Sequence, residues 1–380
     1  LLSNIKSSDF SKIIKQDFIL TKFNWYYLKN KKLNTGTNCK SISLIDFNKK
    51  QISFSLIENW VKLHSCVLPK NKSISLNTDN YNLFIQSVEN IWSNFLIKLL
   101  IRNNKSAYKI NPWPSPYKAA ISIRYDVDRE LQSTEITQAR DIQKFFLNSY
   151  CASWFFKDKY NNDVIEKKIE LKKFSQEVAY HHESKGRIKA NGITFHSSTS
   201  ADYFRGNQSL LDFNENYKYS EFLYNSIPTI RKGIIYKNKK YFSSKINILP
   251  LHYPLESGTD DKSLKYFEQN FKHLKNHLKT SSHVVIATHP DLNKDLLIKL
   301  TSKINFDKYW MKPIIEVVER WEKTKEPGNL LMYNDKFGNL FLKSKFNISN
   351  LNFEVLDEKQ SKSFDLNIKS FDVYNLEKKC

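Results

Sequence analysis

Glycine is scarce in this chain, with only 8 in 380 residues. Loops that wrap the phosphates of a nucleotide need glycine, because their backbone approaches the ligand closely and adopts torsion angles that other residues avoid. Neither a Walker-type loop nor a dinucleotide-binding fingerprint occurs in the sequence. The scarcity of glycine therefore disfavours a nucleotide-binding protein of either kind.

Cysteine is also scarce, and long apolar runs are absent. The four cysteines lie far apart without the paired spacing of a metal site, so we expect ordinary reduced thiols. No apolar run approaches the ~18 residues that a membrane-spanning helix requires. The sequence begins at Leu1 without an initiator Met. No secretion signal is visible in it, so the default expectation is a cytoplasmic protein.

The composition is otherwise that of a folded protein, with 40% hydrophobic and 14% aromatic residues. The net charge of +21 would suit a nucleic-acid partner, since basic surfaces bind phosphate backbones. However, only eight of the 60 basic residues are Arg, the lysines are spread along the whole chain, and no nucleic-acid-binding motif occurs. We therefore expect no nucleic-acid partner, and attribute to the charge an effect on solubility and on attraction to acidic glycans or lipid surfaces.

The segment Ala119–Asp128 alternates between apolar and polar residues and ends in two acids. Successive side chains of a strand point to opposite faces, so the apolar residues and the acids should lie on different sides. The apolar side would carry Ile121, Ile123, Tyr125 and Val127, and the polar side Ser122, Arg124, Asp126 and Asp128. Two neighbouring carboxylates repel each other, which a divalent metal or a shared proton would compensate. Most acid pairs of this kind are solvated or cap the next helix.

Strands and helices alternate from about residue 113 to residue 325, which predicts a parallel α/β architecture. Polar residues recur where strands end, which fits a barrel. The predicted helices are 130–148, 163–175, 261–279, 293–302 and 313–325, and the predicted strands after Asp128 are 149–156, 177–182, 192–196 and 283–289. Three prolines in positions 112–116 cannot continue a helix or a central strand. We therefore predict three regions, an N-terminal α+β region of unknown role (1–110), the α/β barrel (111–326), and a small β appendage with a tail (327–380).

Four predicted strands end in side chains that can bind metal or move protons. They carry Asp126 with Asp128, then His181 or His182, then His196, and finally His289. Each of these strand ends alone is weak evidence for a site, because single histidines are more often structural or surface residues. Their recurrence at the same end of successive strands favours one common site. The loop with His252 and Glu256 could line it, but its prolines favour an ordinary surface loop.

This region resembles the polysaccharide deacetylase family, the NodB-homology carbohydrate esterases. Arg124-Tyr125-Asp126-Val127-Asp128 is similar to the family's Asp-Val-Asp motif, which implies Asp126 as general base and Asp128 as metal ligand. Glu177-Val178-Ala179-Tyr180-His181 is similar to its second motif and implies His181 as a ligand, and Val284 to Pro290 resembles its last motif, with His289 as general acid. A loose counterpart of the arginine motif is Tyr203-Phe204-Arg205-Gly206.

The resemblance implies a deformed (β/α) barrel and a metal-dependent deacetylase, a hydrolase of C–N bonds other than peptide bonds. The family's second motif has another His four positions on, yet position 185 is Lys here. Either His196 supplies the third ligand, or the metal is weakly held or absent. With His196, a zinc ion would be held by Asp128, His181 and His196.

The expected substrate is a carbohydrate, an N-acetylated or O-acetylated sugar of an envelope polysaccharide or its precursor. Arg205, Tyr203 and Trp154 are the candidate substrate-binding residues, with Trp310 as a further aromatic platform. The alternative function is a non-catalytic descendant of this fold that binds glycan in its cleft.

Overall fold

The computed structural model describes the carboxyl-terminal two thirds of the chain in part. The described residues are 45–46, 51–52, 106–128, 130, 134, 136–137, 139, 141, 152–157, 171–172, 175–182, 190–195, 217–221, 230–237, 240–249, 252–254, 271, 274–275, 278–279, 282–290, 302–357 and 361–376. No helix among them is both long and apolar enough to span a membrane. The predicted N-terminal region falls almost wholly outside these residues, apart from residues 106–110 and two short paired strands, β1 (Ile45–Asp46) and β2 (Gln51–Ile52).

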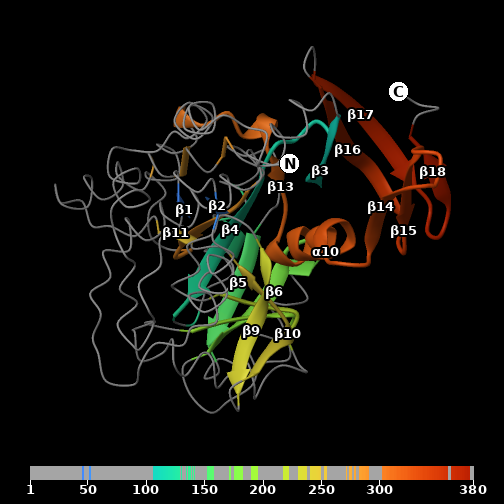
Figure 1. Ribbon diagram of the computed structural model, residues 1–380. Coiled ribbons are helices and arrows are strands. Elements are labelled where there is room, and N and C mark those ends of the chain that lie inside the picture. Colours follow the sequence, from blue (N-terminus) through green and yellow to red (C-terminus); the bar gives the residue numbers. More distant parts are fainter. Residues whose placement is uncertain are drawn as a thin grey trace.

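A large, mainly parallel sheet forms the centre of the described structure (Figure 1). Its strand order is β11-β12-β4-β5-β6-β7-β8-β10-β9, with β13 beside β4. The strands are β4 (Ala120–Val127), β5 (Ala152–Lys157), β6 (Glu177–His182), β7 (Gly192–Phe195), β8 (Tyr219–Glu221), β9 (Arg231–Lys237), β10 (Lys240–Leu249), β11 (His252–Pro254), β12 (His283–Thr288) and β13 (Trp310–Met311). The pairs from β11 to β8 are parallel, so the prediction of a parallel α/β sheet is confirmed. Closure of the sheet into a barrel stays a prediction, since the described strands form an open path.

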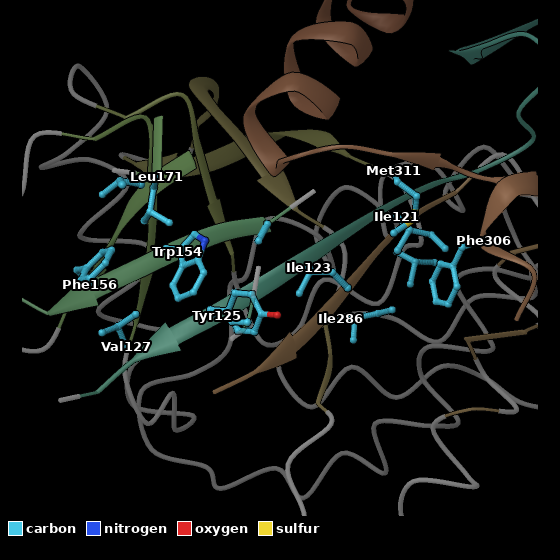
Figure 2. Close-up of a cluster of buried hydrophobic side chains, with 14 of the residues drawn as sticks. Ile121, Ile123, Tyr125, Val127, Trp154, Phe156, Leu171, Ile286, Phe306 and Met311 are labelled. Carbon is cyan, nitrogen blue, oxygen red and sulfur yellow. The ribbon is translucent and has the colours of Figure 1, made fainter. Parts of the chain in front are cut away.

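Strand β4 has the two faces that its alternation predicts. Ile121, Ile123, Tyr125 and Val127 all belong to one buried apolar cluster, together with Trp154, Phe156 and Ile286 from the neighbouring strands. Figure 2 shows these side chains along one side of β4, β5 and β12. The intervening residues Ser122, Arg124 and Asp126 are buried too, which places them on the other face.

Helix α10 (Ile314–Lys325) covers the amino-terminal end of that other face. Its Ile314, Val317 and Val318 pack in a second cluster with Phe155 and Val285 of the sheet. The first N–H groups of a helix have no partner within the helix. Here the sheet caps them, because the Ile314 N–H donates to Ser153 Oγ (2.9 Å) and the Ile315 N–H to Glu177 Oε2 (3.0 Å).

Two further three-stranded sheets, formed by the strands after α10 together with β3, share a separate core. Their orders are β14-β15-β18 and β17-β16-β3, and their strands are β3 (Ala107–Pro114), β14 (Leu330–Asn334), β15 (Leu340–Ser344), β16 (Ile348–Leu356), β17 (Ser361–Ile368) and β18 (Val373–Asn375). Figure 1 shows α10 between the large sheet and these strands. Arg320 of α10 joins the parts by donating to the carbonyl oxygens of Pro112 (3.0 Å) and Ser349 (2.8 Å).

Two segments differ from the expectation of irregular structure. The proline-rich stretch up to Pro114 belongs to β3, which tolerates proline because it is an edge strand. His252–Pro254, expected as a surface loop, forms β11 at an edge of the large sheet and pairs with β12. Both segments are too short or too rich in proline for alternation to reveal a strand. The domain limits at 110 and 326 stay predictions.

Candidate functional site

The register of the sheet brings polar residues to the carboxyl ends of four adjacent strands, β12, β4, β5 and β6. Asp126 pairs with Phe155, Lys157 with His181, and Thr288 with Tyr125. Asp128 follows β4 directly, and His289 follows β12 directly. In parallel α/β proteins, this edge of the sheet carries the binding and catalytic residues.

Asp126 is bound by an arginine of its own strand. Arg124 Nε donates to Asp126 Oδ1 and Arg124 Nη2 donates to Asp126 Oδ2, both at 2.6 Å. Both residues are buried, and the guanidinium lies over the Phe155 ring, 5.2 Å from its centroid. A carboxylate engaged on both oxygens by a guanidinium is a poorer proton acceptor than an isolated one. The role of Asp126 as general base stays a prediction, and this pair weighs against it.

Asp128 is the centre of a cluster of basic side chains, which we call the Asp128 cluster: Asp128, Lys157, His181 and His289. Asp128 Oδ1 lies 3.1 Å from Lys157 Nζ and 3.4 Å from His181 Nδ1. Asp128 Oδ2 lies 3.2 Å from His289 Nε2. Three strands, β5, β6 and β12, thus each bring one basic group to the carboxylate at the end of β4.

The Asp128 cluster has a buried back and an accessible front. The side chains of Lys157 and His181 are 5% and 3% exposed, whereas those of Asp128 and His289 are 32% and 18% exposed. Burial works to raise the pKa of Asp128, but the hydrogen bond with His289 and the charges of His181 and Lys157 outweigh it and hold that pKa well below its ordinary value. A ligand would therefore meet an ionised carboxylate beside a histidine.

The described residues do not fit a divalent metal as they stand. Asp128 Oδ1 and His181 Nδ1 are separated by a distance that two ligands of one ion could have, but the ammonium of Lys157 contacts that same oxygen. No three His, Cys, Asp or Glu side chains within the described part of the chain are arranged to hold an ion. The predicted third ligand, His196, lies outside that part, so the zinc site stays a prediction.

The predicted substrate-binding residues are not brought together in the described structure. Trp154 is fully buried on the opposite face, where its indole lies against Tyr125 with ring centroids 4.5 Å apart and donates to Gln176. An indole without exposed surface cannot stack on a sugar in this arrangement. Tyr203 and Arg205 lie outside the described residues, and Trp310 packs near Trp113 with centroids 6.1 Å apart.

Sequence reasoning missed the roles of Arg124 and Lys157. Arg124 precedes Asp126 by two positions in a strand, so a shared face was a readable signal. Lys157 lies one residue beyond the predicted end of its strand. That strand is buried on both faces, so alternation gives no indication of which residues point toward the site.

A second buried carboxylate lies at the opposite end of the sheet. Glu177 accepts from Ser153 Oγ (2.6 Å), Tyr219 OH (2.8 Å) and the Ile315 N–H, and thereby caps α10. Tyr219 reaches it by packing over Gly192, where any side chain would overlap the tyrosine ring. This network is structural, since it holds the helix to the sheet at the end away from the Asp128 cluster.

Glu177 predicts a measurable dependence of stability on pH. Burial raises the pKa of Glu177 from 4.5 to about 7, although its hydrogen bonds act in the opposite direction. The folded chain then keeps a proton that the unfolded chain releases, so stability falls as pH rises from 4.5 through 7, by roughly 3 kcal/mol. In Glu177→Gln, the free energy of unfolding measured with urea should no longer fall by this amount between pH 4.5 and pH 7. Glu316→Gln, in the exposed first turn of α10, is the matched control and should leave the pH dependence as it is; a wild-type dependence in Glu177→Gln would contradict the assignment.

Comparisons with known proteins assign neither a family nor a function to this chain. No protein-family model matches the chain, and no curated protein matches it. Similar solved structures include a chain from Mycobacterium smegmatis classed as a polysaccharide deacetylase, with 14% identity and a TM-score of 0.39 over 56% of this chain and 94% of that one. Another is the peptidoglycan deacetylase PdaC from Bacillus subtilis, with 13% identity and a TM-score of 0.32 over 55% and 94%. At TM-scores below 0.5, these similarities decide neither the fold nor the reaction.

Proposed function

We propose that the chain is a carbohydrate deacetylase, which hydrolyses the N-acetyl or O-acetyl group of a sugar in an envelope polysaccharide or its precursor. The observation that carries the proposal is the Asp128 cluster, in which three strands bring basic groups to one carboxylate at the carboxyl edge of a parallel sheet. Sites of hydrolysis in α/β folds lie at this edge. The motifs that resemble those of the deacetylase family end at the same place.

His289 is the residue that we assign to proton transfer. Hydrolysis of an acetamido group breaks the C–N bond, forms a C–O bond from water, and moves one proton from that water to the departing amine. His289 is accessible, and its Nε2 hydrogen-bonds Asp128 Oδ2. Because an ionised carboxylate only accepts hydrogen bonds, Nε2 carries a proton in this pair. Asp128 thereby orients the ring.

Lys157 and His181 contact Asp128 from its buried side. Both lie within 3.4 Å of Asp128 Oδ1 and are buried, so their charges act with little screening by solvent. Together with the hydrogen bond from His289, which has the larger effect, they hold the pKa of Asp128 below its ordinary value. We assign them a positioning role.

A second candidate function, non-catalytic glycan binding, is favoured by the Arg124–Asp126 pair. Both oxygens of Asp126, the predicted general base, are taken up by the guanidinium. A site whose predicted general base is engaged in this way could hold a sugar and leave its acetyl group in place. The two functions thus differ in acetate release and agree in sugar binding.

The experiment offers the wild-type chain a panel of N-acetylglucosamine oligomers and O-acetylated xylan oligomers. Acetate release is measured enzymatically, and binding of the same oligomers by calorimetry. Acetate formed in proportion to the protein concentration supports the deacetylase. Binding without acetate supports glycan binding alone, and the absence of both contradicts both functions.

A further inference from the structure

We infer that the Lys157 ammonium takes the place of a divalent cation at Asp128, so that the Asp128 cluster excludes such an ion and works with a fixed charge of the protein. This inference rests on the proposed function only in taking the Asp128 cluster as the functional site. The observation behind it is that Lys157 Nζ lies 3.1 Å from the carboxylate oxygen that also faces His181.

The fold leaves Lys157 little freedom to lie elsewhere. It is the last residue of β5, a strand whose six residues are all buried, and it pairs directly with His181 of β6. Phe155, two positions earlier on the same face, packs in the second apolar cluster. The backbone therefore directs the lysine side chain to the carboxylate after β4, where only 5% of that side chain is exposed. A buried ammonium needs a counter-charge, and Asp128 supplies it.

Charge balance at the carboxyl edge supports the same conclusion. Arg124 and Asp126 cancel each other in a bidentate pair, and Lys157 and Asp128 form the second pair. A divalent ion bound to Asp128 Oδ1 would add positive charge beside the ammonium of the second pair. An ion bound to Asp128 Oδ1 would also lie next to the Lys157 ammonium, because metal ligands are only about 2 Å from their ion.

The fixed ammonium can carry out part of what a bound cation would do. It lies beside Asp128 Oδ1 at the buried side and leaves Asp128 Oδ2 to His289. It cannot supply a coordinated water, since an ammonium has only hydrogen-bond donors. Proton transfer in this site then depends on His289, and affinity for zinc should be limited by the cost of moving Lys157 away.

The test is a calorimetric titration of the full chain with Zn²⁺, without substrate. Wild type should bind Zn²⁺ weakly at best, and Lys157→Met should bind one ion at least about 100-fold more tightly, because a positive charge within ~3 Å of the ion has been removed. Lys157→Met with Asp128→Asn should lose this gain. Lys218→Met is the matched control, since Lys218 pairs with Glu319 at the surface (2.6 Å) and should leave zinc binding as in wild type.

Tight binding of one Zn²⁺ by wild type would overturn the inference, and so would a Lys157→Met chain that binds zinc no more tightly than wild type. If Lys157→Met unfolds because Asp128 has lost its partner, added Zn²⁺ should restore the wild-type Tm, and an absence of rescue would equally overturn it. The titration involves no sugar, so it can succeed or fail whether or not acetate is released. Failure of the proposed function is thus distinguishable from failure of this inference.

Discussion

His289→Gln is expected to lower kcat/KM for acetate release by about 10²- to 10⁴-fold, the range over which a positioned acid or base accelerates a reaction. His289 is the accessible basic group of the Asp128 cluster, and its hydrogen bond with Asp128 Oδ2 fixes which nitrogen carries the proton. Gln keeps a donor for that hydrogen bond but cannot exchange a proton. The loss should therefore appear in kcat with little change in sugar affinity.

His283→Gln is the matched control, since His283 stands at the other end of the same strand, β12. Its Nε2 lies 2.9 Å from Ser122 Oγ, and burial lowers its pKa to about 3, so the ring is neutral at ordinary pH. An amide donor can replace its N–H group, at some cost in packing. This variant should lose stability and keep the kcat/KM of its folded fraction. Equal losses of kcat/KM in both variants would contradict the role of His289.

Asp126→Asn is expected to lower the free energy of unfolding by about 3–5 kcal/mol, because it leaves the Arg124 guanidinium buried without its counter-charge. Both hydrogen bonds of the pair are 2.6 Å long, and Arg124 is 3% exposed. Urea unfolding measures the change. Replacing both residues at once, as Arg124→Met with Asp126→Leu, should recover much of the loss, since no buried charge remains.

The exposed pair of Lys218 and Glu319 provides the comparison for this prediction. Glu319→Gln should change the free energy of unfolding by less than about 1 kcal/mol, as is typical of surface ion pairs. A stable Asp126→Asn chain that has lost acetate release would instead show that Asp126 acts as the general base, as its sequence motif implies. The two measurements together thus decide between a structural and a catalytic Asp126.

The sequence is informative wherever one face of an element differs from the other. The alternation in β4 predicts correctly that Ile121 and Tyr125 face an apolar layer and that Arg124 and Asp126 lie opposite. The predicted strand 177–182 coincides with β6, and the predicted helix 313–325 nearly coincides with α10. His289 could be named because it follows an apolar strand, whereas the choice of His181 over His182 came from the motif that resembles the deacetylase family.

The sequence could not predict which side chains pair with one another. The role of Asp126 as general base beside a metal stays a prediction, but its pairing with Arg124, two residues away on the same face, was not foreseen. Lys157 was not singled out because β5 is apolar throughout, and only the register with β6 places it beside His181. Trp154 was expected at the site, but a strand buried on both faces gives no indication of which aromatic side chain points away from it.

The central claim, hydrolysis of an acetyl group at the Asp128 cluster, is tested most directly by NMR on a chain with ¹⁵N-labelled histidine rings. An oligomer of N-acetylglucosamine with ¹³C-labelled acetyl groups is added, and the ring signals and free acetate are followed together. The account predicts that the His289 signals shift on addition of sugar, that those of His283 do not, and that labelled acetate accumulates. Acetate that accumulates while the His289 signals stay unchanged would contradict the account, because the reaction would then take place elsewhere on the chain.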